Sequence, residues 1–339
     1  MILTSGRSAK KAGPVCHAYL RSVYKMGVTH AQKNREVPRV SDMLSSALLR
    51  RYIGRRLTAL RQHAGLTQED AAAALQRARA TLGRMEEGHE SVRFRDIEVK
   101  AMLDLYKASL QDTQLLLALT AETRNGRRKS WWHDYTETAL PEWFGLYVSL
   151  EDSAEKIRQY EPELVPGLLQ TQTYAEQVTR VPAGYIDEVE IQRRVAVRME
   201  RQSLLTGRRA PDLSVILNES ALHRSAGDGS VMAEQFKHLL DLTQQDNISV
   251  RVLPFSAGVH GGMAASAFTI LDFPKDPRTE ELLEPPLVYV DTLTGAMYLN
   301  KPDEVSAYEL AWDDLGQRAL DDSASRKMIT TAMEGLTGG

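Results

Sequence analysis

Cysteine is almost absent from this sequence of 339 residues, in which Cys16 stands alone. A single cysteine can form no intramolecular disulfide and cannot supply a cysteine-rich zinc site. Apolar residues nowhere approach the run of roughly 18 that a membrane-spanning helix needs, and the N-terminus lacks the compact apolar stretch of a signal peptide. We therefore expect a soluble, cytoplasmic protein that enters no membrane and binds no metal.

The residue spacings that mark common enzymes are also missing. The sequence contains no H-x-x-x-H pair, no G-x-S-x-G turn and no phosphate-binding glycine loop. The side chains from which an active site would have to be assembled are His133, His223, His238, His260, Glu161, Glu219 and Asp291. None of them lies at the spacing of a known catalytic or metal motif, so we expect neither catalysis nor a cofactor.

Charges of both signs are present but unevenly distributed. Residues 1–129 hold 24 Lys and Arg against 12 Asp and Glu, whereas residues 130–339 hold 18 against 33. A module that neutralises nucleic-acid phosphates, joined to an acidic regulatory region, would have this distribution. Residues 1–42 contribute half of the basic excess, with 8 basic and 2 acidic side chains.

Hydrophobic periodicity predicts a series of short helices after this basic stretch. Apolar residues recur at helical spacing from Leu49 to Leu60, among four arginines, and Gly65 ends that helix. Thr67 has the position of an N-cap residue, and Asp70 completes a capping box for a second helix that ends near Leu75. A tight turn follows. A third helix ends at Glu87-Gly88, and two more are expected over 94–108 and 111–124.

The segment from the end of the first expected helix to the end of the third has a specific order of residues. It consists of Arg61-Gln62-His63-Ala64-Gly65-Leu66-Thr67-Gln68-Glu69-Asp70 followed by Leu75, Thr81, Leu82, Arg84, Met85, Glu86 and Gly88. This order resembles the XRE, or lambda-repressor-like, helix-turn-helix family. Members of such a family place a recognition helix in the major groove of double-stranded DNA and normally bind as homodimers.

The resemblance implies a role for each matching position. Gln68 matches the glutamine that hydrogen-bonds the DNA backbone or nearby bases, and Arg79, Ala80 and Arg84 match positions that face base edges. Arg61 and Glu86 match a structural ion pair between the first and third helices. The DNA-contacting residues that we predict are Gln68, Arg77, Arg79, Ala80, Thr81, Arg84 and Arg93.

The match to the family is imperfect around the turn. Gln76 and Arg77 replace the usual glycine and apolar residue, and Ala78 replaces the common Ser or Thr cap. Gly83 weakens the recognition helix by about 0.5 to 1 kcal/mol relative to alanine. A helical bundle that has kept the fold and lost DNA binding is therefore the alternative, although the arginines at 77, 79 and 84 favour DNA binding.

The second half of the chain mixes helix and strand patterns. Strands are expected over 148–160, 213–217, 248–253, 267–273, 287–291 and 296–299, and helices over 173–180, 187–205, 231–244, 302–320 and 323–334. We therefore expect an α+β chain, with an all-α five-helix helix-turn-helix domain followed by a mixed α+β domain that contains an antiparallel sheet.

This second half has a family resemblance of its own. It is carried by Trp131-Trp132-His133-Asp134-Tyr135, Tyr160-Glu161-Pro162, Val165-Pro166-Gly167-Leu168-Leu169-Gln170-Thr171, Val252-Leu253-Pro254-Phe255-Ser256-Ala257-Gly258, Val288-Tyr289-Val290 and Leu293-Thr294-Gly295-Ala296-Met297-Tyr298-Leu299. These segments look like the domain of unknown function that follows the helix-turn-helix in antitoxin-like regulators of actinobacteria. The resemblance implies a small partner protein encoded by a neighbouring gene.

The domain boundaries follow from these patterns. We expect a basic, disordered arm over 1–42, a helix-turn-helix domain over 43–126, a linker over 127–130 and a regulatory or partner-binding domain over 131–337. The arm either extends the DNA-binding domain towards the phosphates or precedes the true start of translation, for which Met26 and Met43 are the candidates.

Several side chains of the second domain allow two interpretations. His260, Trp132 and Trp143 are candidates for a ligand or partner site, but a loop histidine is more often solvated and aromatic residues at a domain junction are more often core. The arginines of 187–205 form either a second nucleic-acid site or a solvated face paired with glutamates.

Three functions remain open at this point. The favoured one is a sequence-specific transcriptional regulator that acts as a homodimer. The second is an antitoxin-like interaction protein that binds a small partner, with DNA binding used for autoregulation. The third is a regulator that senses a small molecule through its C-terminal domain.

Overall fold

The computed structural model describes residues 46–89, 91–125, 142–181, 183, 186–275, 280–293 and 295–337. All of them belong to one contact unit, residues 39–339. The expected arm over 1–42, the linker over 127–130 and the domain boundaries at 43, 126 and 131 lie outside the described residues. So do Cys16 and Trp132, and nothing is described of the side chain of Trp143.

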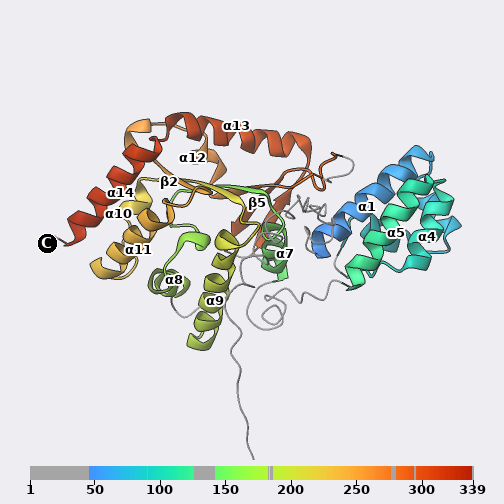
Figure 1. The fold of residues 1–339 in the computed structure, drawn as a ribbon, viewed down its shortest axis with the longest axis horizontal. Helices are drawn as coiled ribbons and strands as arrows, with labels where there is room; N and C mark the ends of the chain where they lie inside the picture. The colour runs from blue at the N-terminus through green and yellow to red at the C-terminus, as the bar shows by residue number, and fades with distance from the viewer. Residues whose placement is uncertain are drawn as a thin grey trace, which may run out of the picture. The chain divides into compact units, whose positions relative to one another are not determined.

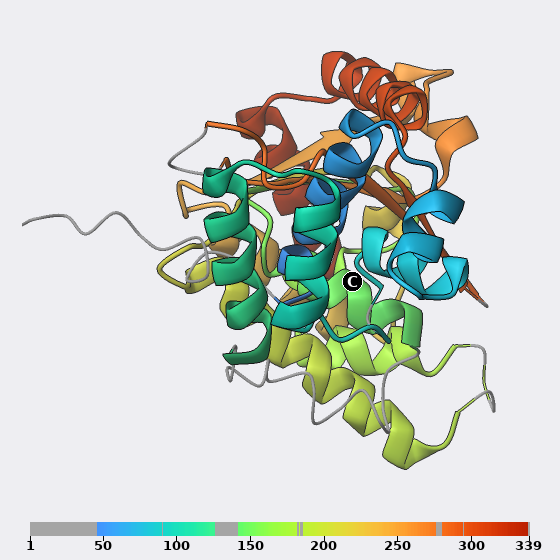
Figure 2. The same ribbon diagram turned by 90° about the vertical axis from the view of Figure 1, so that its right-hand side faces the viewer.

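Residues 46–125 form a group of five helices, coloured blue to teal in Figures 1 and 2. Leu48, Ile53, Leu57, Leu82 and Leu103 are buried and belong to one apolar core. The helices are α1 Ser46–His63, α2 Gln68–Ala74, α3 Arg79–Glu86, α4 Asp96–Leu105 and α5 Leu110–Asn125. They lie within a few residues of the expected positions, so the all-α first part of the predicted fold class is confirmed.

The second part of the chain is built on one six-stranded sheet, in the order β3-β2-β1-β4-β5-β6. Its strands are β1 Lys156–Glu161, β2 Asp212–Asn218, β3 Ile248–Leu253, β4 Phe268–Asp272, β5 Leu287–Thr292 and β6 Gly295–Leu299. The α+β class is confirmed, but the sheet is mixed rather than wholly antiparallel. Helices connect β1 to β2 and β2 to β3, which lets these three strands run parallel, whereas β4, β5 and β6 pair antiparallel.

Helices cover both faces of this sheet. Figure 1 shows α13 and α12 on one face and α8, α9 and α11 on the other. The bounds are α7 Glu142–Glu151, α8 Gln172–Thr179, α9 Glu188–Arg201, α10 Ser220–His223, α11 Gly229–Leu242, α12 Gly262–Ala265, α13 Pro302–Arg318 and α14 Asp322–Thr337, with 3-10 turns η2 Gly167–Leu169, η3 Gln202–Thr206 and η4 Phe255–Ala257.

The two faces have separate apolar clusters, as alternation along the strands requires. Tyr160, Ile216, Phe268 and Val288 pack with residues of α12 and α13. The residues between them in the strands, such as Ile157 and Leu213, belong to the other cluster, to which α11 and α14 contribute. The same alternation decides which side chains at the ends of the strands share a face.

The strand expected over 148–160 was wrong in its first half. Residues 148–151 complete α7, and β1 begins only at Lys156. Tyr147, Val148, Ser149 and Leu150 are all buried, because α7 contacts both α1 and β6. A helix buried on several sides has no clear amphipathic period, so its sequence cannot be distinguished by pattern from that of a buried strand.

Candidate nucleic-acid interface

The turn between α2 and α3 has the geometry of a helix-turn-helix despite its unusual sequence. Thr67 caps α2 and forms the expected capping box with Asp70, which also keeps the pKa of Asp70 below its ordinary value through hydrogen bonds to Thr67. Gln76 then adopts a left-handed conformation with φ of 54°. This is the position where the XRE-like family that this segment resembles has glycine, which takes positive φ without steric cost. Ala78, the N-cap of α3, gives no side-chain cap.

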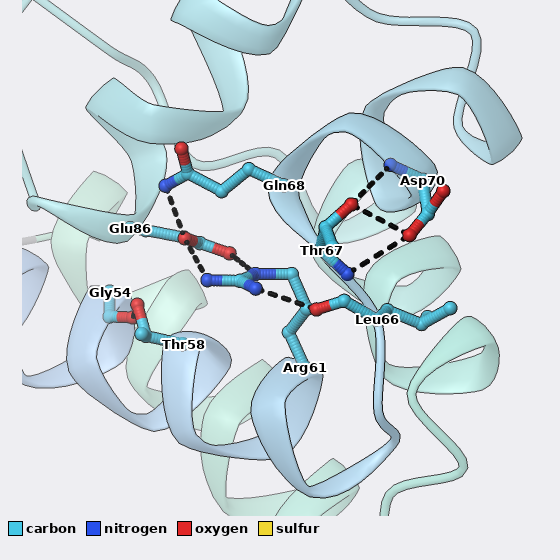
Figure 3. Close-up of polar contacts among 8 residues, drawn as sticks. All are labelled: Gly54, Thr58, Arg61, Leu66, Thr67, Gln68, Asp70 and Glu86. Atoms are coloured by element: carbon cyan, nitrogen blue, oxygen red, sulfur yellow. Dashed lines mark hydrogen bonds and ion pairs between the residues drawn. The ribbon is translucent and has the colours of Figure 1, made fainter.

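A chain of polar contacts ties α1 to the two helices of the motif, α2 and α3 (Figure 3). Arg61 donates from Nε and Nη2 to the carboxylate of Glu86, at 2.6 and 3.0 Å. Its third nitrogen, Nη1, donates to the carbonyl of Leu66 at 2.7 Å. Both side chains of this ion pair are buried, and the hydrogen bond to Glu86 raises the pKa of Arg61. The ion pair that the resemblance implied is therefore present.

Gln68 extends this chain to the surface. Its Nε2 donates to Oε2 of Glu86 at 2.9 Å, so the carboxylate that accepts from Arg61 also orients the glutamine. The side chain is half-buried and stands at the first position of α2. The contact fixes one end of the amide and leaves Oε1 and the second N–H as the groups with which Gln68 can bind DNA.

The outer face of α3 presents the residues expected to contact base edges. Arg79, Ala80 and Arg84 are exposed, and Thr81 is half-buried. Leu82, Met85 and Glu86 face inward and are buried, so the helix is anchored on the opposite side. Arg84 donates from Nε to the carbonyl of Ala80 at 3.3 Å, and Arg79 pairs with exposed Glu69 at 3.2 Å. Both guanidinium groups remain accessible to a ligand outside the helix.

The other predicted contacts are less well placed. Arg77 is exposed but pairs with Glu98 of α4, which offsets part of its charge. Arg93 is exposed in the segment before α4. The basic residues of α1 are largely engaged within the protein, because Arg51 and Arg55 pair with buried Glu284 at 2.8 and 3.1 Å. The arginines of α3 are therefore the better candidates for DNA contact.

Two glycines let α1 approach the end of α3: Gly88, which was expected to end the third helix, and Gly54, which was not predicted from the sequence. A Cβ atom on Gly54 would lie 2.4 Å from the carbonyl oxygen of Glu86. A Cβ atom on Gly88, whose φ is 66°, would lie 2.5 Å from the backbone nitrogen of Arg51. An isolated glycine inside a helical pattern is the signal that would have identified Gly54, since such a glycine usually has a packing reason.

Comparison with known families agrees with this geometry. A model described as a helix-turn-helix domain matches residues 53–116. A second model, described as a domain of unknown function (DUF5753), matches residues 144–331, more than half of the chain. The chain belongs to the DUF5753 family. The comparisons with curated proteins and with solved structures each found no match.

Three of the four arginines expected to form a second nucleic-acid site on α9, inside the DUF5753 region, are engaged within the protein, and Arg193 is exposed. Arg201 is only 7% exposed and pairs with buried Glu151 at 2.8 Å. Arg194 pairs with Glu190 at 2.8 Å, and Arg198 donates to Gln170 at 2.7 Å. The expectation of a solvated face was also wrong for Arg201, because the amphipathic period of α9 turns this residue towards the protein interior.

His260, the DUF5753 residue considered as either a ligand site or a solvated loop histidine, lies between η4 and α12 and is half-buried. Its ring meets Tyr160 edge-on, with centroids 6.1 Å apart. Burial lowers its pKa, with opposite contributions from Asp314, which raises it, and Arg318. The side chains of Trp132 and Trp143, the other two candidates for this site, lie outside the described residues. No described helix is long and apolar enough to cross a membrane.

The strained turn leads to a stability prediction for this DUF5753 chain. Gln76→Gly is expected to raise the free energy of unfolding by about 0.5 to 1 kcal/mol. The left-handed conformation costs a residue with a Cβ atom roughly 1 to 2 kcal/mol, and the extra freedom of glycine in the unfolded chain offsets about 0.5 to 1 kcal/mol of the gain. Urea denaturation would measure the difference. Gln76→Ala is the control and should give no gain; equal stabilities for the two variants would contradict the assignment of strain.

Proposed function

We propose that this DUF5753 chain is a sequence-specific, XRE-type transcriptional regulator that binds double-stranded DNA through α3. The observation that carries the proposal is the outward face of Arg79, Ala80 and Arg84 on a helix whose inner face is fixed by the Arg61–Glu86 pair. An arginine held in this way can bind guanine O6 and N7 with both nitrogens, which is worth about 1 to 3 kcal/mol of discrimination. A cytoplasmic location belongs to the same proposal, since genomic DNA is the partner.

The proposed regulator acts as a homodimer. One α3 offers few base contacts, and helix-turn-helix proteins reach useful affinity by placing two recognition helices in half-sites one helical turn apart, about 34 to 36 Å. The excess of basic residues in 1–129 supports attraction to phosphates, and the acidic excess in 130–339 keeps the rest of the chain away from them.

Selection of bound fragments from the host genome by the purified protein would test this proposal. We expect the fragments to share one sequence with two related half-sites a helical turn apart. Binding that recovers fragments without a common sequence, at the same salt concentration, would contradict sequence-specific regulation. Repeating the selection with the product of the neighbouring gene would show whether that product changes binding.

A second candidate is an antitoxin-like role, in which the acidic region binds a small protein and DNA binding is autoregulatory. Exposed apolar side chains around α12 and α13 favour it: Phe255, Val259, Met263 and Leu310 are 60%, 82%, 67% and 72% exposed. Exposed apolar side chains that gather in one region are typical of protein interfaces. The test is whether the product of the neighbouring gene co-purifies with the protein in stoichiometric amount. Loss of co-purification in Val259→Ser and Leu310→Ser would support this role. Unchanged co-purification in both variants would exclude this surface.

A further inference from the structure

Two carboxylates at one edge of the sheet lie in a position where ligands commonly bind. Glu161 ends β1, and Asp291 lies near the end of β5. The register pairs Gln159 with Thr269 and Thr269 with Tyr289. Since β1 and β5 are both antiparallel to β4, they run in the same direction. Glu161 follows Gln159 by two residues, and Asp291 follows Tyr289 by two residues. The two carboxylates therefore lie at the same level and on the same face of the sheet, on either side of β4.

The same edge is a topological switch point of the sheet. The strands β2 and β3 lie on one side of β1, and β4, β5 and β6 lie on the other. The carboxyl ends of β1, β2, β3 and β5 therefore share the edge at which the chain changes direction across the sheet. In open α/β sheets, ligands bind outside the carboxyl ends of the strands at such a point.

Helix α9 adds one positive charge to this edge. The charge of Arg198 lowers the pKa of Asp291, and the charge of Asp291 raises that of Arg198. Asp291 also raises the pKa of Glu161, whereas Arg198 lowers it. Arg198 is hydrogen-bonded to Gln170, and Glu161 accepts from Gln159 at 2.8 Å. In the described part of the chain, Arg198 forms no ion pair with either carboxylate. Arg201 of the same helix also lowers the pKa of Asp291, but it is paired with Glu151. When both carboxylates are ionised, they leave one negative charge in excess over Arg198.

A buried hydroxyl belongs to the same group. Tyr289 is 5% exposed, lies on the same face of β5 as Asp291, and stacks on Tyr147 with centroids 4.1 Å apart. Its hydroxyl has no hydrogen-bond partner among the described residues. Burial raises its pKa first, and the charge of Asp291, two residues further along the same face of β5, raises it further. A buried hydroxyl without a protein partner can accept a hydrogen bond from a water, an ion or a ligand.

We propose that Glu161, Asp291, Arg198 and Tyr289 form a binding site for a small organic monocation, an ammonium or guanidinium compound. One such charge balances the excess carboxylate, and its N–H groups can donate to both carboxylates and to the tyrosine oxygen. A divalent metal is a poorer fit, since no group of three potential ligands exists among the described residues. The site goes beyond DNA binding and requires none, so the two proposals can fail separately.

The electrostatics of the site make binding depend on pH. Burial raises the pKa of Glu161 to about 8, assisted by Asp291 and opposed by Gln159 and Arg198. The charge of Glu161 in turn raises the pKa of Tyr174 of α8 and of Tyr160 in β1 itself. Glu161 is therefore largely protonated at neutral pH and must release its proton to pair with a cation. Affinity should rise as the pH increases towards this pKa and level off above it.

Calorimetric titration of the full chain, without DNA, would test the site. The probes are butylammonium, benzylammonium and guanidinium, each paired with its neutral counterpart: butanol, benzyl alcohol or urea. We expect at least one cation to bind and its neutral counterpart not to bind. Glu161→Gln and Asp291→Asn should each weaken the cation by about tenfold or more, and Tyr289→Phe by less.

The control is Glu163→Gln, an exposed carboxylate paired with Arg224, which should bind as the parent protein does. Glu161→Gln should also abolish the rise of affinity with pH while keeping an unchanged circular dichroism spectrum and a melting temperature no lower than that of the parent. Failure of every cation to bind would overturn the proposal. The proposal would also be overturned if both Glu161→Gln and Asp291→Asn bound the cation with the affinity of the parent protein.

Discussion

Replacement of Arg61 by methionine is expected to lower the free energy of unfolding of the helix-turn-helix region by about 3 to 5 kcal/mol. The substitution removes the only ion-pair partner described for Glu86 and leaves that carboxylate buried against α1. It also removes the hydrogen bond to the carbonyl of Leu66, which ties the end of α1 to the start of α2. Urea denaturation followed by circular dichroism would measure the loss.

Two further variants separate this effect from a general intolerance to substitution. Lys100→Met breaks an exposed pair with Asp104 and should change stability by less than about 0.5 kcal/mol. Arg61→Met combined with Glu86→Met removes both charges and should recover most of the loss. A loss under about 1 kcal/mol in Arg61→Met alone would show that the buried pair does not hold the motif together.

Substitution of Gly54 by alanine should cost about 2 to 3 kcal/mol, although alanine favours a helix by about 1 kcal/mol. The new Cβ atom would overlap backbone atoms at the end of α3, 2.4 Å from the carbonyl oxygen of Glu86 and 2.7 Å from that of Met85. Backbone atoms cannot rotate away as a flexible side chain can. The first and third helices must therefore separate, and thermal unfolding should begin at a lower temperature.

Gly83→Ala is the matched control for this substitution. Gly83 also lies within a helix, but a Cβ atom there would meet only the amide of Gln68, at 3.9 Å. This variant should gain about 0.5 to 1 kcal/mol from helix propensity. Stabilisation by both alanines would contradict the close approach of α1 and α3.

Local chemistry explains how much of the first part could be predicted from the sequence. The capping box of Thr67 and Asp70, the glycine that ends α3 and the apolar period of α1 each depend on neighbouring residues only, and each was placed correctly. The Arg61–Glu86 pair could be predicted because the order of residues resembles a known motif. Gly54 was missed because the backbone atoms that exclude a larger residue there belong to α3, far away in the sequence.

The second part was harder for the same reason. Whether a strand such as β3 pairs parallel or antiparallel depends on the path of the chain between strands, which no local pattern records. Glu161 and Asp291 appeared as scattered carboxylates until the register of β1, β4 and β5 brought them level. Arg201 was expected in solvent because its buried ion-pair partner, Glu151, belongs to α7, a helix whose pattern resembles that of a strand.

The assignment of α3 as the recognition helix is tested most directly by DNA affinity at fixed salt. Three variants are measured, each on the selected genomic fragment and on a fragment of scrambled sequence. Arg79→Ala with Arg84→Ala should lower the ratio of specific to scrambled affinity by about 10- to 100-fold per arginine that binds a base. Gln68→Ala should weaken both fragments alike, and Arg193→Ala, an exposed arginine of α9, should change neither. An unchanged ratio in the double variant would contradict the assignment of α3 as the recognition helix.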